Sequence, residues 1–324
     1  LILLQSVLDT TFQTTVVATA DRADEALTLA ATAGLAVGEW LLVYGHNGVG
    51  DAANMADGSN VELAELVQVS AVGTPATLVA GLRQCHVAGV AADRVRPVIG
   101  AEVSNLRLVG DAGLAVGIFA QGVVGLVLNN IRGRGFSRSL IELSGGTTRF
   151  EINYPYSEGA NHGLVHGSSV MVGVVREPGS SQDGARGAAT GIPRPLLYFR
   201  HRSSDLRVEH PNLNHAYYGI RFVGGWFNSV VGGAVSDMFL PSAIKSVGDT
   251  STIACGTGFL SGATGADAEI GWGNAVCGTL FVDCAHESSS DGVVLVRDQL
   301  SFGLDCSIQN RGQVGASGRW SGGL

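Results

Sequence analysis

The sequence predicts an all-β protein, specifically a single-stranded right-handed parallel β-helix, a solenoid in which similar coils stack along one axis. Three observations support this prediction. Glycine is abundant, with 47 of 324 residues, and only 15% of the chain is charged. The apolar content of 45% is mainly aliphatic, since aromatic residues make up 6%, which favours strands around a narrow core. Short apolar stretches also alternate with Gly/Ser/Asn corners along most of the chain.

The first part of the chain, residues 1–94, is expected to form an N-terminal β-rich capping region. Its apolar segments have the length of strands, and turns rich in Gly, Asn and Asp separate them. No segment here has the pattern of a long helix. The expected strands are residues 15–18, 26–30, 40–44, 61–69 and 77–80.

The coils themselves are expected over residues 95–314, followed by a Gly-rich C-terminal linker at 315–324. An alternating strand buries one face, and matching alternation in neighbouring coils allows parallel hydrogen bonding at a spacing of about 4.8 Å. An antiparallel β-sandwich is the alternative, although it would need hairpin turns on a more regular schedule. The expected coil cores are 117–119 with 126–128, 140–142 with 150–152, 163–165 with 170–172, 196–198 with 206–208, 219–221 with 230–231, 243–245 with 252–254, 279–281, and 293–295 with 302–304.

Charge and composition argue against several classes of partner. The net charge is −8, and Lys245 is the only lysine, so no basic run is available for nucleic acid. The most apolar window, residues 114–128, is shorter than the about 20 residues of a membrane-spanning helix and contains several glycines. The cysteines have no paired CxxC spacing and no His/Cys/Asp cluster has metal-ligand spacing, so we expect no metal site. No phosphate-cradling loop is present either, and we expect no cofactor.

Several segments resemble bacteriophage tailspike and pectate-lyase-like right-handed parallel β-helix proteins. Residues 35–44 (LAVGEWLLVY), followed after a polar loop by residues 64–72 (AELVQVSAV), resemble the Gly-acid-Trp turn that precedes the first full coils in those proteins. The phrases at 161–165 (NHGLV) and 214–220 (NHAYYGI) are similar to their coil openings. The resemblance covers most of the chain, but it consists of fold-forming patterns and contains no catalytic signature.

This resemblance implies a homotrimer mounted on a phage tail as a spike or fibre, and therefore a virion component or an extracellular protein. It further implies contact with other phage tail proteins and binding, often with cleavage, of a bacterial surface polysaccharide. Members of the group place their active carboxylates on different coils, within or between subunits. No catalytic residue can therefore be carried over by position, and fold alone does not establish function.

Two sets of polar residues could carry catalysis. A glycoside hydrolase needs two carboxyl groups, about 5 Å apart for retention or roughly 6.5 to 9.5 Å apart for inversion. Glu151 and Glu209 are predicted to point outward from one sheet, two coils apart, with Asp205 at the corner before Glu209. In the alternative interpretation, these carboxylates are solvated or balance Arg149 and Arg207.

A polysaccharide lyase instead needs a cation to neutralise a uronate and a base to remove the adjacent proton. Tyr198 and His201 are the candidate bases, and Arg200 and Arg221 are the candidate cations. The alternative is a trimer interface or a surface ladder. Three further aromatic residues could stack on sugar rings or be buried between subunits: Tyr217, Tyr218 and Trp226. His166 is predicted to face the core, level with Phe199 and Phe222.

The sequence therefore favours a spike that binds a bacterial polysaccharide and depolymerises it as a glycosidase or a lyase. The alternative is a receptor-binding or structural spike component of a phage-like particle, without catalysis. A free secreted lyase acting on pectin-like polymers is a weaker hypothesis, because the calcium-binding aspartates it would need are not clustered in this sequence.

Overall fold

The computed structural model describes most of the chain up to residue 238 and short strands beyond it. The described residues form strands, turns and bends without a helix, so none of them forms an apolar helix of membrane-spanning length. The described ranges are 1–45, 63–84, 86–110, 114–158, 163–180, 195–200, 203–216, 218–223, 228–238, 244–247, 275–277, 280–282, 294–297, 302–304, 307–309 and 320–321.

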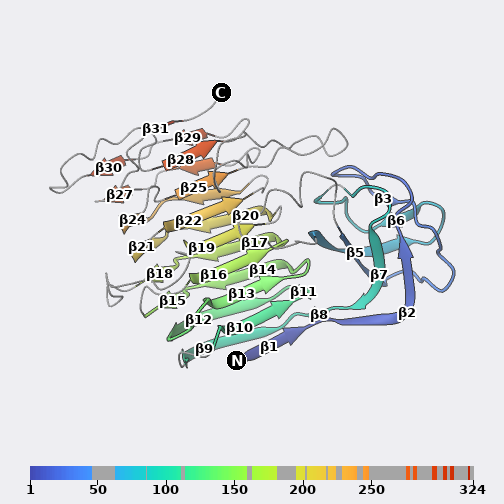
Figure 1. Cartoon of the computed structure of the whole chain (residues 1–324), viewed down its shortest axis with the longest axis horizontal. Coiled ribbons are helices and arrows are strands. Elements are labelled where there is room, and N and C mark those ends of the chain that lie inside the picture. The colour runs from blue at the N-terminus through green and yellow to red at the C-terminus, as the bar shows by residue number, and fades with distance from the viewer. Residues whose placement is uncertain are drawn as a thin grey trace.

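A parallel β-solenoid forms the body of the molecule (Figure 1), which confirms the predicted fold class. Its first sheet has nine strands, each paired in parallel with the next. The outer side of this sheet is called face A below. The strands, in sheet order, are β1 (Ile2–Gln5), β10 (Val116–Gln121), β13 (Ser139–Ser144), β16 (Gly163–Ser168), β19 (Pro195–Arg200), β22 (Tyr218–Val223), β25 (Ile244–Val247), β28 (Val294–Arg297) and β31 (Trp320–Ser321).

The second sheet is bent, because most coils contribute two strands to it. The long strands β9 (Glu102–Val109) and β12 (Val127–Arg134) run through both halves. The first half, face B, continues with β8 (Val98–Ile99), β11 (Val123–Val124), β14 (Thr148–Asn153), β17 (Met171–Arg176), β20 (Ser204–Glu209), β23 (Ser229–Val231), β26 (Ala275–Cys277) and β29 (Phe302–Leu304). The second half, face C, continues with β15 (Tyr156–Ser157), β18 (Gly179–Ser180), β21 (Asn212–Ala216), β24 (Ala234–Met238), β27 (Leu280–Val282) and β30 (Ser307–Gln309).

The bend between faces B and C is made by one residue per coil in the left-handed conformation. Asn105, Asn130, Tyr154, Glu177 and His210 occupy this position at φ values between 48° and 56°. The Asn130 side chain also donates a hydrogen bond to Asn105 of the preceding coil at 3.0 Å. Asparagine enters this conformation readily, whereas other non-glycine residues do so less often. The stacked coils therefore impose the bend also on Tyr154, Glu177 and His210, which adopt this conformation less readily than asparagine does.

The N-terminal region is inserted within the first coil. Strand β1 pairs with β10 of the solenoid, and the chain returns to the solenoid at β8 and β9. Between them lies a six-stranded antiparallel sheet, drawn beside the stack in Figure 1. In sheet order it contains β2 (Val7–Thr15), β7 (Ala91–Arg96), β4 (Trp40–Gly45), β5 (Leu63–Ala71), β6 (Ala76–Leu78) and β3 (Ala26–Leu27). The expected division at residue 94 remains a prediction, but β1 belongs to the solenoid stack.

Two aliphatic cores hold these parts together. The solenoid core contains fully buried Leu128 from one coil and Ile141 and Ile152 from the next, and each such side chain contributes about 1.5–3 kcal/mol. The inserted sheet has a core of its own. A smaller cluster joins the two, in which Leu66 of β5 packs near Val124 of β11. The insertion is therefore packed against the side of the solenoid.

The predicted coil cores agree with the strands for much of the solenoid. The expected segments 117–119, 140–142, 163–165 and 196–198 lie in β10, β13, β16 and β19. The expected core at 252–254 lies outside the described residues. The strands found in the described part of the inserted sheet include the expected segment at 40–44.

Candidate functional site

Face A presents a row of polar side chains at equivalent positions of consecutive coils. Strand pairing aligns Glu142 of β13 with His166 of β16, His166 with Tyr198 of β19, and Tyr198 with Arg221 of β22. Their neighbours Ile141, Val165 and Leu197 are fully buried in the core. Because side chains alternate along a strand, those of Glu142, His166 and Tyr198 lie on the outer side of the sheet, with steps of about 4.8 Å between coils.

Contacts along this row link the groups that could carry chemistry. The rings of His166 and Tyr198 meet edge to face, with centroids 5.6 Å apart. The Arg200 guanidinium carbon lies 5.7 Å from the centroid of the Tyr198 ring, and Arg200 shares the outer side because it follows two residues later. Arg138 forms an ion pair with Glu142 at 2.6 Å. Face A thus combines a carboxylate, an imidazole, a phenol and a guanidinium on three adjacent coils.

The predicted position of His166 is wrong by one residue. The strand pairing sets His166 opposite Tyr198, and it is Gly167 that lies level with Phe199 and Phe222. A shift of one residue moves a side chain to the other face of a strand. His166 is nevertheless only 7% exposed, since its ring lies over Gly163, where a Cβ would collide with the imidazole. The absence of a side chain at Gly163 makes room for this histidine.

The structure therefore brings together part of the predicted lyase set. Tyr198 and Arg200 lie side by side, and Arg221 occupies the next position of the same row by its backbone register. The backbone of Tyr218 lies in β22. Three predicted residues, His201, Tyr217 and Trp226, lie outside the described residues. Glu142 and His166 were missed as face A residues, although both stand in predicted strands beside buried aliphatic residues.

The predicted hydrolase pair Glu151 and Glu209 lies on face B, two coils apart as expected. Arg176, on the coil between them, binds both carboxylates, with N–O distances of 2.6 Å to Glu151 and 3.1 Å to Glu209. Arg207 contacts the other oxygen of Glu209 at 2.7 Å. Hydrogen bonding to Glu151, the largest cause, raises the pKa of Arg176 above its ordinary value. The positive charge of Arg176 therefore balances both carboxylates. The alternative interpretation expected this role for Arg207, which does form an ion pair with Glu209.

Asp205 is separated from this pair and is bound by the insertion. Arg22 donates two hydrogen bonds to its carboxylate, both at 3.1 Å, and Arg83 lies at 3.9 Å. Asp205 and Glu209 are at opposite ends of β20, which places them about 13 Å apart along the strand. Asp205 therefore anchors the insertion to the solenoid and does not complete a carboxylate pair with Glu209.

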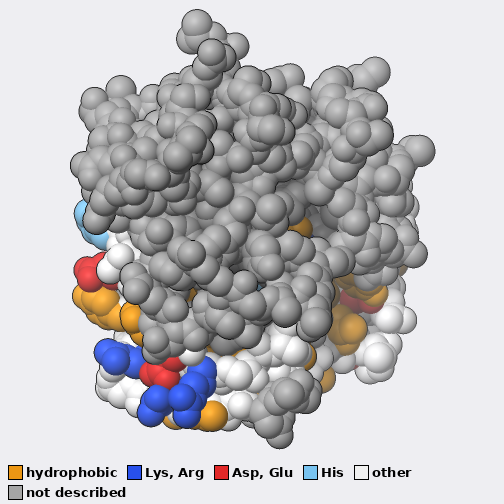
Figure 2. Space-filling view, turned by 60° about the vertical axis from the view of Figure 1, so that its left-hand side comes forward, with side chains coloured by type: hydrophobic (Ala, Val, Ile, Leu, Met, Phe, Trp, Pro, Cys, Tyr) orange, Lys and Arg blue, Asp and Glu red, His pale blue; other side chains and the backbone are white. Residues whose placement is uncertain are grey.

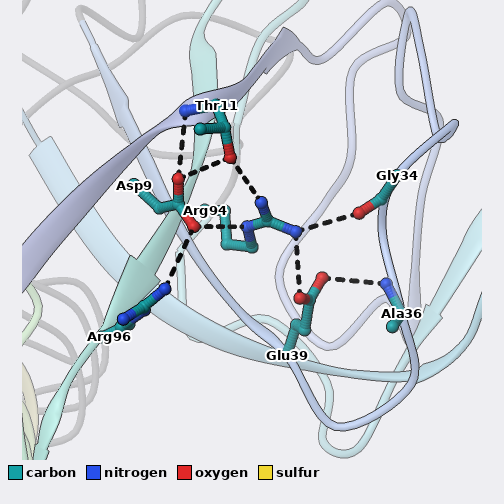
Figure 3. A network of polar contacts seen from close by, with 7 residues as sticks. All are labelled: Asp9, Thr11, Gly34, Ala36, Glu39, Arg94 and Arg96. Atoms are coloured by element: carbon teal, nitrogen blue, oxygen red, sulfur yellow. Dashed lines mark hydrogen bonds and ion pairs between the residues drawn. The ribbon is translucent and has the colours of Figure 1, made fainter.

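A pocket of ≈ 440 Å³ lies where the inserted sheet meets the first coil, between residues such as Trp40 and Ile99. The charged residues that line this pocket form a network of ion pairs (Figure 3), in which Arg94 binds Asp9 and Glu39, each at 3.0 Å. Glu39 also accepts a hydrogen bond from the backbone of Ala36 at 2.8 Å. The acidic residue of the Gly-acid-Trp turn therefore stabilises the insertion. No group of metal-ligating side chains was found among the described residues.

The architecture defines the chain as a parallel β-solenoid with an antiparallel insertion, and solved structures of the same class were found. The tailspike gp61 of Pseudomonas phage phi297 matches with a TM-score of 0.50 and 12% identity, covering 97% of this chain and 54% of that one. The tailspike gp49 of Pseudomonas phage LKA1 matches with a TM-score of 0.50 and 10% identity, covering 94% of this chain and 62% of that one.

A more distant likeness is to the Gp54 tailspike of Acinetobacter baumannii bacteriophage AP22, solved in complex with A. baumannii capsular saccharide. Its TM-score is 0.41 at 10% identity, covering 97% of this chain and 60% of that one. No protein-family model and no curated protein matches the sequence. The chain spans between 54% and 62% of the tailspikes it resembles. The similarity to phage tailspikes is thus confirmed at the level of the fold.

Proposed function

We propose that this chain is the solenoid part of a phage tailspike that binds a bacterial surface polysaccharide along face A and cleaves it. Fold similarity to two tailspikes supports the class of protein. The observation that carries the proposal is the contact of Tyr198 with His166 and Arg200 on the outer side of one sheet. The assembly would be a homotrimer located on the tail of the virion.

Face A has the groups that an extended glycan requires. An aromatic ring can cover the apolar side of a sugar, and a guanidinium can bind a sugar carboxylate through paired hydrogen bonds. Tyr198 and Arg200 offer these two functions next to each other. Because equivalent positions recur on each coil, a polymer lying along the solenoid axis would meet several polar groups in succession.

The arrangement favours β-elimination over hydrolysis. In a uronate-containing polymer, Arg200 and Arg221 would neutralise the carboxylate, which makes the proton on the adjacent carbon easier to remove. Tyr198 in its phenolate form would take that proton as the base and become a neutral phenol. The resulting carbanion would form a carbon–carbon double bond as the bond to the glycosidic oxygen breaks, and water would protonate the leaving oxygen. The hydrolase candidates lack a comparable site, since Arg176 holds Glu151 and Glu209 and the insertion holds Asp205.

The proposal is tested by incubating the protein with a panel of bacterial capsular and O-antigen polysaccharides. A lyase generates new reducing ends together with the ultraviolet absorbance of an unsaturated product, whereas a hydrolase generates reducing ends alone. We expect both signals on a uronate-containing polymer, and their loss in Tyr198→Phe. Reducing ends alone, removed by Glu151→Gln or Glu209→Gln, would overturn the assignment to face A.

A spike without catalysis remains the second candidate, because the three residues in contact on face A could bind a receptor glycan without cleaving it. Saturable binding to a polysaccharide that stays intact would support this alternative. Light scattering on the protein should give the mass of a trimer, and a monodisperse monomer would contradict the proposed assembly.

A further inference from the structure

A second polar surface lies on face C, away from the face A row. Arg107 of β9 and Arg132 and Arg134 of β12 are all exposed, and all three act on the carboxylate of Glu158. Basic side chains gather around an acidic one on the face shown in Figure 2. We call Arg107, Arg132, Arg134 and Glu158 the face C patch.

The solenoid register builds this patch. Arg107 aligns with Arg132 on the next coil, and Arg132 aligns with Tyr156 of β15 on the coil after that. The Arg132 guanidinium carbon lies 5.7 Å from the centroid of the Tyr156 ring. A Cβ at Gly179, on the following coil, would collide with that ring. Gly179 therefore lets Tyr156 lie against the sheet, and Tyr156 supports Arg132.

The patch carries an excess of positive charge in an acidic protein. Arg107 holds Glu158 through three hydrogen bonds of 3.1, 3.1 and 2.7 Å. These bonds, the largest cause, lower the pKa of Glu158, so the acid is ionised and cancels one of the three cations. Among the described residues, no carboxylate forms an ion pair with Arg132 or Arg134. Two positive charges thus remain on a chain whose net charge is −8.

We propose that the face C patch is a second binding site, for the carboxylate groups of an acidic polysaccharide. Arg132 and Arg134 project on the same side of β12, about 6.6 Å apart along the strand. A guanidinium presents paired N–H donors that match a carboxylate, and the stack on Tyr156 limits the freedom that Arg132 would lose on binding. The site lies on a different face from Tyr198, so it stands or fails independently of cleavage at face A.

The experiment is isothermal titration calorimetry with oligomers of polygalacturonate, alginate and hyaluronate as probes and neutral dextran as the comparison. We expect wild-type protein to bind at least one acidic probe more than tenfold more tightly than dextran. The double variant Arg132→Gln/Arg134→Gln should lose about tenfold in affinity, or 1.4 kcal/mol. Added salt should weaken wild-type binding and have less effect on the variant.

A matched control removes the same charge elsewhere. Arg149 and Arg207 are exposed on face B, and Arg149→Gln/Arg207→Gln should retain wild-type affinity. Equal losses of probe affinity in both double variants would indicate a general charge effect and overturn the proposal. The proposal would also be overturned if the wild-type protein bound none of the acidic probes. If the patch instead meets a second copy of the chain, Arg132→Gln/Arg134→Gln will change the sedimenting mass and leave probe affinity unaltered. The Arg132→Gln/Arg134→Gln substitutions should also be made in a Tyr198→Phe protein that no longer cleaves. A loss of probe affinity in that protein would show that the two sites are separate.

Discussion

Asp205 should behave as a structural residue, and a double-mutant cycle with Arg22 measures this role directly. The side chains are 25% and 24% exposed, and the guanidinium makes two contacts of 3.1 Å. Exposed ion pairs contribute about 0.2–1 kcal/mol, whereas breaking a buried pair costs about 3–5 kcal/mol. A pair that is three-quarters buried lies between these limits, so we expect a coupling free energy of about 1–2 kcal/mol.

The cycle compares wild type, Arg22→Gln, Asp205→Asn and the double variant by urea unfolding. Asp205→Asn should destabilise the protein, because burial already lowers the pKa of Arg22 and Asp205 opposes that effect. Removal of Asp205 therefore leaves a partly buried cation without its main partner. Any polysaccharide cleavage should persist in the folded Asp205→Asn protein. A coupling below about 0.3 kcal/mol, or loss of cleavage without loss of stability, would refute this assignment.

Two further predictions concern the solenoid and the insertion. Gly173→Ala should destabilise the protein by about 1–3 kcal/mol, because a Cβ at this position would collide with the Phe150 ring. In thermal unfolding, Gly173→Ala/Phe150→Leu should recover part of the lost stability. If the stability losses of the two single substitutions simply add, the clash is contradicted. Hydrogen bonds from Thr11 are the largest cause, together with Arg94, of a pKa of Asp9 below its usual 3.8. Ionised Asp9 therefore stabilises the folded protein at pH values above 3.8, and this stability is lost as the pH falls through the folded-state pKa. Urea midpoints should therefore fall less steeply with acid in Asp9→Asn than in wild type, and equal slopes would argue against the network in Figure 3.

The coil pattern could be predicted from the sequence because each coil repeats the same local alternation. Residues 140–142 and 163–165 show an aliphatic core position next to an outward one, and both lie in the expected strands. The insertion could not be predicted this way. The chain enters the solenoid at β1 before it forms the insertion, but β1 is short. Its residue Ile2 pairs with Ile118, which is far along the chain. Local patterns do not reveal such distant pairing.

The candidate site was predicted only in part, for related reasons. Tyr198 and Arg200 share one strand, so alternation alone places them on one face. The face of His166 depends on register between strands, where an error of one residue reverses the result. Asp205 was grouped with Glu209 by proximity in sequence, whereas its partner Arg22 is separated from it by 183 positions. Ion pairs between an insertion and its host leave no local signal in either segment.

The central claim is that face A binds the polysaccharide, and the most direct test is the affinity of three variants for the polymer that wild-type protein recognises best. Tyr198→Ala and Arg200→Gln should each weaken binding by about tenfold or more, equivalent to 1.4 kcal/mol. Glu151→Gln, which removes a face B contact with Arg176, should bind as wild type does. Unchanged affinity in both face A variants, together with a loss in Glu151→Gln, would contradict the claim and move the site to face B.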